Sequence, residues 1–184
     1  MHMVMVRHGQ SVWNLEGRLQ GQTMDIPLTY LGREQAQQAA EQVAALVARP
    51  LLVSSDQVRA LQTAHIIAER IGVEPVTTEL AREHHFGELE GRTRAELHAQ
   101  PVPEGQHINE IAWGGGESVQ ELYARCARLL DHLRTLADSS GSEELVLVSH
   151  GDALRVLLAV IDDVGHREVE WRPITNGEVI TRNL

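Results

Sequence analysis

Two histidines stand where short apolar runs stop, and each is followed by glycine. His8 comes two residues after the apolar residues 3–6, and His150 comes two residues after the apolar residues 145–148. Runs of this length and composition predict buried β-strands. Because the carboxyl ends of parallel strands meet at one edge of a sheet, we expect the two imidazoles to lie together at that edge.

Two arginines are expected at the same edge. Arg7 directly precedes His8, and Arg59 falls in the first turn of a helix predicted after a third apolar run, residues 51–53. Two guanidinium groups and two imidazoles beside helix N-termini form a site for an anion, and phosphate matches the fork of arginine. All sixteen basic residues are arginine, which excludes Schiff-base chemistry and the lysine of nucleotide-binding loops.

This set of residues suits the transfer of a phosphoryl group to a histidine. A neutral ring at His8 can attack phosphorus, and nearby arginine charges disfavour its protonation. Arg7, Arg59 and a protonated His150 could hold the oxygens of the transferred group, while a carboxylic acid protonates the leaving alcohol. The alternative, with structural histidines and surface arginines, accounts less well for two histidine-glycine strand ends that occur together with both arginines.

Alternating strand and helix patterns must position these residues. Helices are predicted over 29–47, 56–71, 118–137 and 152–161, with Thr29, Ser55 and Ser118 as N-caps of the first three. Strands are predicted over 3–6, 51–53, 145–148 and 179–183, with loops over 15–27 and 81–106. This alternation predicts an α/β fold, a three-layer α/β/α sandwich around a mostly parallel sheet. We expect a single domain over residues 1–184.

Composition limits the partners and the location. The chain has 184 residues, 42% hydrophobic content and a net charge of −10, which argues against binding to nucleic acid or to an anionic membrane. No apolar run approaches the length of a membrane span, and the first residues predict a core strand rather than a signal peptide. Cys126 is the only cysteine, so no intrachain disulfide can form, and we expect a cytoplasmic protein.

Motifs along nearly the whole chain resemble one known family. Arg7-His8-Gly9-Gln10-Ser11, with Asn14, resembles the signature of the histidine phosphatase superfamily, also called the phosphoglycerate mutase family. Further similar blocks follow in order: Gln20-Gly21; Asp25 to Thr29 with Gly32, Gln35 and Ala36; Ser54-Ser55-Asp56 with Arg59-Ala60 and Thr63-Ala64; Glu83 with Phe86-Gly87 and Glu90-Gly91; Gly116-Glu117-Ser118; and Ser149-His150-Gly151. The resemblance implies the phosphoglycerate mutase-like α/β fold.

The resemblance also implies a role for each matching residue. It implies that His8 is the nucleophile that becomes phosphorylated, and that Glu83 is the proton donor and later the base. The implied phosphate and substrate contacts are Arg7, Asn14, Gln20, Gly21, Arg59, His150 and Gly151. No metal or other cofactor is implied. The block around Glu83 departs a little from the family pattern, so Glu88 or Glu90 is the alternative acid.

The family contains both phosphatases and mutases, which differ in whether water or a second substrate oxygen takes the phosphoryl group. Its mutases resemble one another in a longer, basic insertion over the pocket. Here residues 81–115 should form a short lid, and the section 92–115 has only Arg92 and Arg94 as formal cations. We therefore favour a phosphatase that hydrolyses a small phosphorylated metabolite, as a monomer or homodimer. A mutase, or a phosphoprotein phosphatase or regulator, is the alternative.

Other reactive residue types have simpler explanations. Cys126 is expected to pack in a helix, and His84-His85 to lie in a substrate-facing loop or at the surface rather than to bind a metal. A solvated helix face is expected from Arg125, Arg128 and Arg134. Possible walls of the pocket are Trp13, Phe86, Trp113 and Trp171, although each of these is more often part of a core.

Overall fold

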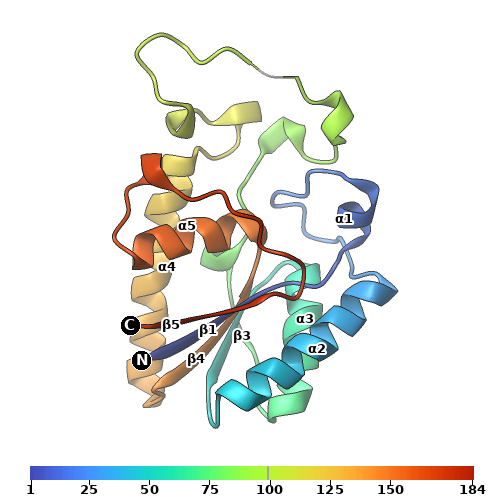
Figure 1. Ribbon diagram of the computed structural model, residues 1–184, viewed down its shortest axis with the longest axis vertical. Helices are drawn as coiled ribbons and strands as arrows, with labels where there is room; N and C mark the ends of the chain where they lie inside the picture. The colour runs from blue at the N-terminus through green and yellow to red at the C-terminus, as the bar shows by residue number, and fades with distance from the viewer. Residues whose placement is uncertain (99) are drawn as a thin grey trace.

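Within the residues that the structure describes, 1–98 and 100–184, a five-stranded sheet forms the centre of the molecule, in the order β3-β2-β4-β1-β5 (Figure 1). The structure is a computed structural model. The strands are β1 (His2–Arg7), β2 (Leu51–Ser55), β3 (Val76–Thr78), β4 (Glu144–Ser149) and β5 (Val179–Asn183). Neighbouring strands are parallel except β1 and β5, which are antiparallel. The predicted mostly parallel sheet is therefore confirmed.

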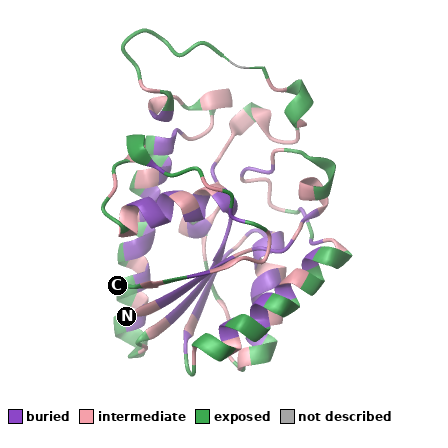
Figure 2. Ribbon diagram, viewed as in Figure 1, coloured by how far each residue is buried: buried purple, intermediate pink, exposed green. Residues whose placement is uncertain are grey.

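Helices cover both faces of the sheet and complete the predicted three layers. α2 (Tyr30–Leu46) and α3 (Val58–Ile71) cover one face, and α4 (Val119–Ser140) and α5 (Gly151–Ile161) cover the other (Figure 1). Met3 and Met5 of β1 pack with α4 and α5, whereas Val4 and Val6 pack with α2 and α3. Successive side chains of a strand point to opposite faces, so a strand covered on both faces must be apolar throughout. Figure 2 shows the resulting buried centre.

Two helix starts have the predicted capping chemistry. The Thr29 hydroxyl accepts a hydrogen bond from the Gly32 amide at 3.0 Å at the start of α2. Ser118 and Glu121 form the expected capping box at the start of α4, in which each side chain bonds the backbone amide of the other residue. This helix continues to Ser140, beyond its predicted end.

The predicted N-cap Ser55 is wrong. Ser55 is the last residue of β2, and α3 begins at Val58 with Gln57 as a cap that makes no side-chain hydrogen bond to the helix. The Ser55 hydroxyl instead lies 2.9 Å from the ring of His150. A residue read from the sequence as part of the helix therefore belongs to the edge of the sheet where the histidines meet.

Loops and short helical turns stand beyond the carboxyl ends of the strands. The structure has a short helix, α1 (Val12–Glu16), that the sequence did not predict; Ser11 caps it. Residues 81–115, in the upper part of Figure 1, contain short 3₁₀ turns at Gly87–Leu89, Arg94–Glu96, Ile108–Glu110 and Trp113–Gly115. Further 3₁₀ turns lie at Glu79–Ala81 and His166–Glu168. The lid role of residues 81–115 stays a prediction, and Ala99 within it lies outside the described residues.

The helices have distinct apolar and polar faces. α4 buries Leu122, Leu129 and Leu133, and exposes Arg128 and Arg134 to solvent, as the sequence predicted for these two arginines. In the part of the chain that the structure describes, no helix combines the length and the apolar character needed to cross a membrane.

Ser118→Ala should lower the free energy of unfolding by about 1 kcal/mol, because it removes the group that accepts the Glu121 amide proton. Urea unfolding followed by circular dichroism measures the change. The matched control is Ser139→Ala near the other end of α4, where the hydroxyl is exposed and donates to the Thr135 carbonyl. The control should change the free energy by less than about 0.5 kcal/mol. Equal effects of the two substitutions would contradict the capping role.

Candidate active site

The carboxyl ends of β1 and β4 bring the two histidines together. Arg7 is paired with Ser149 in the parallel register of these strands, so the next residues, His8 and His150, stand side by side. The His8 amide donates to the Ser149 carbonyl at 3.0 Å, and the centroids of the two rings lie 5.1 Å apart. Both residues are fully buried. The convergence expected from the sequence is present at this edge of the sheet.

Hydrogen bonding leaves one ring nitrogen of His8 with a free lone pair. Nδ1 lies 2.7 Å from the Gly9 carbonyl oxygen, which can only accept, so Nδ1 carries the proton and Nε2 does not. Burial and the charges of Arg59 and Arg7 hold the pKa of His8 well below its ordinary value. The ring is therefore neutral at physiological pH, which is the state that nucleophilic attack requires.

His150 is also neutral, which corrects the protonated ring expected from the sequence. Burial and the charge of Arg59 hold the pKa of His150 well below its ordinary value. The Ser55 hydroxyl accepts from the Gln57 amide at 3.3 Å and lies 2.9 Å from His150 Nε2. Its own proton is then available to Nε2, which leaves the ring proton on Nδ1. His150 thus offers an N–H donor and no positive charge.

Three buried nitrogen atoms have no hydrogen-bond partner in the described part of the chain: Arg7 Nε, Arg59 Nε and His150 Nδ1. Buried polar groups are rarely left unpaired, so three unpaired donors in one cluster indicate a site for a group that accepts hydrogen bonds. The Nη atoms of Arg59 donate to the carbonyls of Thr23 and Gly21 at 2.9 and 2.8 Å. Burial lowers the pKa of Arg59 to about 10, so its guanidinium stays charged. The cluster suits the oxygens of a phosphate group.

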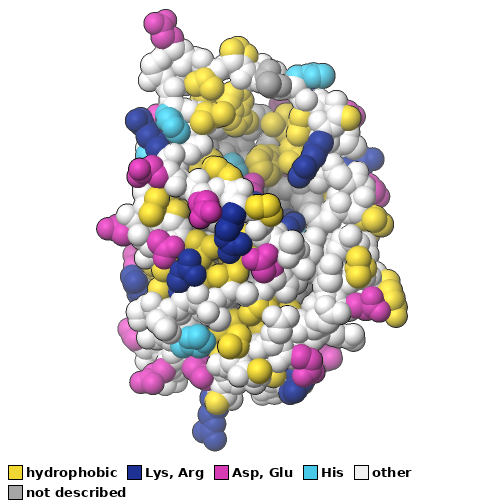
Figure 3. Space-filling model, in the orientation of Figure 1, with side chains coloured by type: hydrophobic (Ala, Val, Ile, Leu, Met, Phe, Trp, Pro, Cys, Tyr) yellow, Lys and Arg dark blue, Asp and Glu magenta, His cyan; other side chains and the backbone are white. Residues whose placement is uncertain are grey.

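A pocket of about 410 Å³ reaches this cluster at Arg7, whereas the buried His8, Arg59 and His150 are not among its lining residues. Figure 3 shows this face of the molecule hollowed, with basic side chains near the rim. The lining residues are Arg7, Trp13, Asn14, Gly17, Arg18, Leu19, Gln20, Gly21, Glu83, Phe86, Arg94, Gly151, Asp152 and Arg155. They come from the loop after β1, the segment after β3 and the start of α5. The loop after β1 and the start of α5 meet at this pocket as expected, whereas no residue of β2 or α3 lines it.

Glu83 reaches the pocket from the segment after β3 and caps the start of α5. Its carboxylate accepts hydrogen bonds from the backbone amides of His84, Asp152 and Ala153 at 2.9, 3.1 and 3.0 Å. Burial and the negative charge of Asp152 raise the pKa of Glu83, against the opposing effects of these amides and of Arg59. A carboxyl group with a raised pKa at a phosphate pocket can donate a proton and later accept one.

The two alternative acids, Glu88 and Glu90, lie elsewhere. Glu88 is exposed and lines a different pocket, together with Leu89 and Trp113. The Glu90 carboxylate accepts hydrogen bonds from the amides of Gln22 and Phe86 and from the hydroxyl of Thr23. Glu90 therefore holds the loop after β1 in place. Neither Glu88 nor Glu90 is among the residues that line the pocket beside Arg7.

Comparisons with known proteins now identify the family. The sequence profile of the histidine phosphatase superfamily (branch 1) matches residues 3–182. The chain belongs to this superfamily. The predicted family and its α/β fold are confirmed.

Phosphatases and mutases both occur among the relatives. A glucosyl-3-phosphoglycerate phosphatase of Mycolicibacterium vanbaalenii is 39% identical over 168 residues, which cover 86% of this chain and 73% of that protein. A 2,3-bisphosphoglycerate-dependent phosphoglycerate mutase of Gloeobacter violaceus is 31% identical over 175 residues, which cover 91% and 78%. The solved complex of a mycobacterial glucosyl-3-phosphoglycerate phosphatase with VO3 has a TM-score of 0.84 at 32% identity, and covers 98% of this chain and 90% of that one. The relatives support a phosphatase that acts on phosphomonoesters.

The remaining contacts implied by the family resemblance line the pocket. Asn14 Oδ1 accepts from the Ser11 amide, and Gln20 Oε1 accepts from the Ser11 hydroxyl at 2.6 Å, which leaves an amide nitrogen of each as a donor at the pocket. The Gly21 carbonyl is held by Arg59. Gly151 is the first residue of α5, where backbone amides favour an anion.

Asn176 is a member of the site that sequence reasoning missed. Its side-chain nitrogen donates to the His8 carbonyl and to Asn14 Oδ1, both at 3.1 Å. It thereby connects the loop before β5 to His8 and to a residue that lines the pocket. The only local signal was an Asn-Gly turn before the last strand, and such a turn does not indicate a contact with His8.

Gln57 is a second missed residue, and it joins the pocket walls. Its Oε1 accepts from the Glu83 amide at 2.8 Å, and its Nε2 donates to the carbonyls of Gly21 and Thr23 at 3.0 and 3.2 Å. One buried amide thus fixes the segment that carries Glu83 relative to the loop that binds Arg59.

Arg125 is buried, so its predicted place on a solvated helix face is wrong. Its Nη atoms donate to the carbonyls of Leu80, Arg82 and Glu83 at 2.8, 2.7 and 3.0 Å. It also pairs with the Glu117 carboxylate at 2.7 Å. Arg125 therefore holds the segment that carries Glu83 against α4.

The other reactive side chains have structural surroundings. His84 Nε2 lies 2.6 Å from the Glu117 carbonyl, and Cys126 packs in the core, where burial raises the pKa of its thiol to about 12. In residues 1–98 and 100–184 there is no group of three or more side chains that could hold a metal ion.

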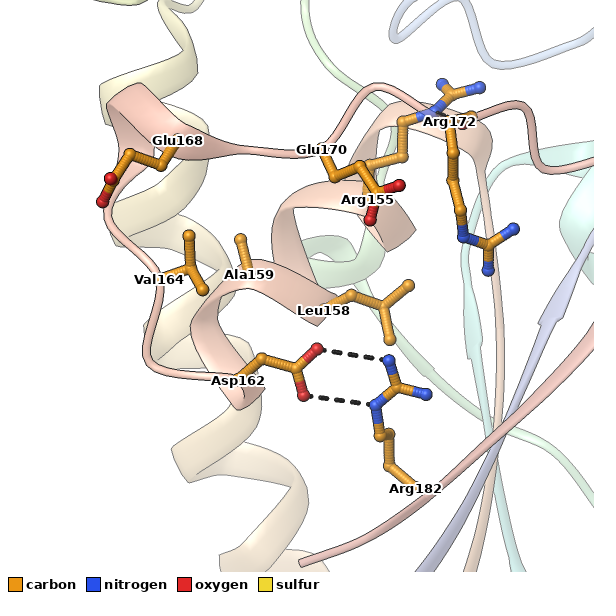
Figure 4. A pocket seen from close by; sticks show the side chains of 9 residues that line it. All are labelled: Arg155, Leu158, Ala159, Asp162, Val164, Glu168, Glu170, Arg172 and Arg182. Carbon is orange, nitrogen blue, oxygen red and sulfur yellow. Dashed lines mark hydrogen bonds and ion pairs between the residues drawn. The ribbon is translucent and has the colours of Figure 1, made fainter.

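A separate pocket of about 240 Å³ lies between α5 and the segment after it, where Asp162 and Arg182 pair at 3.2 Å (Figure 4).

Arg125→Met should lower the free energy of unfolding by about 3 kcal/mol, because the Glu117 carboxylate and three backbone carbonyls lose a buried partner. Urea unfolding measures the loss. Arg128→Met on the exposed face of the same helix is the matched control and should change stability by less than about 0.5 kcal/mol. A loss for Arg125→Met no larger than that of the control would show that its ion pair and hydrogen bonds contribute nothing.

Proposed function

We propose that this protein is a metal-independent phosphomonoesterase that hydrolyses a small phosphorylated metabolite through a phosphohistidine on His8. The observation that carries the proposal is the cluster of unpaired buried donors, Arg7 Nε, Arg59 Nε and His150 Nδ1, around a neutral imidazole. The Glu83 carboxyl group at the same pocket supplies the acid and base. The proposed reaction needs no cofactor, nucleic acid or membrane. We expect the enzyme to act in the cytoplasm as a monomer or homodimer.

In the first step His8 takes the phosphoryl group. The lone pair on Nε2 attacks phosphorus, and the bond from phosphorus to the ester oxygen breaks. The protonated Glu83 gives its proton to that oxygen, so the product leaves as a neutral alcohol. Arg7, Arg59 and the Nδ1–H of His150 hold the peripheral phosphate oxygens as charge moves onto them.

In the second step water removes the phosphoryl group. The Glu83 carboxylate takes a proton from water, whose oxygen attacks phosphorus while the bond to Nε2 breaks. Inorganic phosphate leaves, and both His8 and Glu83 return to their starting protonation states. The same carboxyl group therefore serves as an acid and then as a base.

A mutase is the second candidate, because a phosphoglycerate mutase is among the relatives. A mutase must keep the substrate bound while the phosphoryl group passes from the enzyme to a second oxygen of that substrate. The composition of the segment 92–115 favours water as the acceptor, since it contains only two arginines and three glutamates, Glu96, Glu104 and Glu110. A phosphoprotein phosphatase or regulator is the remaining alternative.

Mixing the protein with a panel of phosphorylated metabolites, followed by denaturing mass spectrometry without acid, should show the mass gain of one phosphoryl group, with inorganic phosphate released. His8→Ala should lose both signals, because no nucleophile remains. Phosphate passed to a second metabolite, with none released, would favour the mutase. A mass gain that persists in His8→Ala would refute the assignment of the nucleophile.

Glu83→Gln should lower kcat/KM for alkyl phosphates by about 10²- to 10⁴-fold, because the leaving alkoxide loses its proton donor. The loss should be much smaller for p-nitrophenyl phosphate, whose leaving group needs no proton. Glu88→Gln, an exposed carboxylate on the next turn, is the matched control and should behave as wild type. Equal losses for alkyl and aryl esters would rule out proton donation by Glu83.

The pH profile of kcat/KM should show that Glu83 must be protonated and His8 neutral. The pKa of Glu83 is raised, so activity is present below that pKa and falls as the pH rises through it. The pKa of His8 is lowered, so the acid limb lies well below the ordinary histidine range. Since the phosphate ester also titrates, the informative measurement is the ratio of the wild-type profile to that of Glu83→Gln. A ratio that does not fall towards basic pH would contradict the role of Glu83.

A further inference from the structure

The active-site pocket continues into a wider groove. Arg7, Arg94 and Arg155 line the pocket, and the same three residues line a second cavity of about 630 Å³. The remaining walls of that cavity are Gln35, Gln38, Trp171, Pro173, Ile174, Thr175 and Asn176. A molecule whose phosphate group reaches Arg7 can therefore extend into this groove without leaving the surface.

Two separate parts of the fold form the groove. Gln35 and Gln38 are three residues apart on α2 and so lie on the same face of that helix. The loop from Trp171 to Asn176 approaches this face just before β5, and it passes in front of the sheet in Figure 1. Gly177 permits the approach: a β-carbon there would lie 3.1 Å from the Gln35 backbone oxygen, and its φ of +77° disfavours other residues.

The groove also touches the catalytic centre directly. Both donors of Asn176 are used, one on the His8 carbonyl and one on Asn14, so its side-chain oxygen is left to accept. Gln35 Oε1 accepts from the Gln10 amide at 2.8 Å, so its nitrogen is left to donate. Gln38 is exposed and can do both.

The amide side chains of the lining suit a hydroxyl-rich group, and Arg94 adds a positive charge beside them. Amides supply donors and acceptors side by side, and a hydroxyl group needs both. No carboxylate lines the groove, and the Arg155 charge is already paired with Asp152. An aliphatic group finds little to contact, because Ile174 is 1% exposed.

Trp171 supplies the apolar part. It is 45% exposed, which is unusual for so large an aromatic side chain surrounded by polar groups. An indole ring offers a flat apolar face with a polar edge. The C–H face of a sugar ring presents a matching apolar surface, while its hydroxyl groups reach the neighbouring amides.

From this geometry we infer that the groove binds a sugar-sized polyhydroxylated group carried by the alcohol part of the phosphate ester. The inference rests on the proposed phosphatase function, of which it names the substrate class. The phosphate enters the pocket at Arg7 and Arg59, and the glycosyl part lies between Trp171 and Gln38. A volume of about 630 Å³ is within the range of sites that hold small organic molecules.

The test compares three esters: glycerol 3-phosphate, 2-O-glucosylglycerol 3-phosphate, and the cyclohexyl ether that matches the glucosylated ester in ring size but lacks its hydroxyl groups. For wild type, kcat/KM for the glucosylated ester should exceed that for each of the others by about tenfold, the effect of one or two net hydrogen bonds with ring contact. Trp171→Ala and Gln38→Ala should each remove most of this preference, chiefly through KM. Gln37→Ala, an exposed amide next to Gln38 that does not line the groove, is the matched control and should keep it.

A binding measurement separates failure of this inference from failure of the proposed function. Calorimetry with His8→Ala measures the affinity of each ester without turnover. Tighter binding of the glucosylated ester that depends on Trp171 and Gln38 upholds the groove even if wild type releases no phosphate. Equal binding of the three esters, or a preference that survives both substitutions, overturns it whether or not the esters are hydrolysed.

Discussion

Positive charge buried at the carboxyl edge of the sheet is the constraint on which the rest of the structure depends. Arg59 is fully buried, and its hydrogen-bond partners are the backbone carbonyls of Gly21 and Thr23 rather than a carboxylate. Burying a cation costs several kcal/mol of desolvation, which the carbonyl dipoles and the nearby charges of Glu83 and Glu90 offset only in part, so the site favours an anion that brings its own charge. Burial lowers the pKa of both His8 and His150, and the Arg59 charge lowers it further. The buried guanidinium thus suits the proposed phosphate site and adds to the effect of burial in keeping the neighbouring rings neutral.

The loop after β1 is shaped to satisfy that guanidinium. The carbonyls of Gly21 and Thr23 accept from Arg59 and also from Gln57. Glu90 holds the same loop through the Gln22 amide and the Thr23 hydroxyl. Gly21 is required in this arrangement: its φ is +48°, and a β-carbon would lie 2.1 Å from the Glu90 carboxylate. In the proposed function Glu90 therefore supports phosphate binding indirectly, through the loop that contacts Arg59. This explains why a carboxylate so close to Glu83 in sequence has a different place in the site.

Local patterns predicted the parts of the molecule whose causes are local. Apolar runs gave the strands, and the abrupt ends of β1 and β4 placed His8 and His150 at one edge before any strand order was known. Asn176 and Gln57 were missed because their side-chain amides bond segments far away along the chain, and no periodicity signals such a bond. Arg125 is different, because it lies three residues after Leu122 and four before Leu129, on the apolar stripe of α4. A charge on a buried stripe must have buried partners, so this contact was open to inference from the sequence.

Glu83 shows how one environment can serve two opposite protonation states. The amides at the start of α5 and the Arg59 charge favour its carboxylate, while burial and the charge of Asp152 favour the neutral acid. The contacts that favour the carboxylate only partly offset the effects that favour the neutral acid, so the pKa of Glu83 is raised but its carboxyl group can still ionise. In the proposed reaction the group must first lose a proton to the alcohol and then recover one from water. A carboxyl group stabilised in only one form would perform one of these steps well and the other badly. The opposed contacts at the start of α5 therefore suit a residue that has to do both.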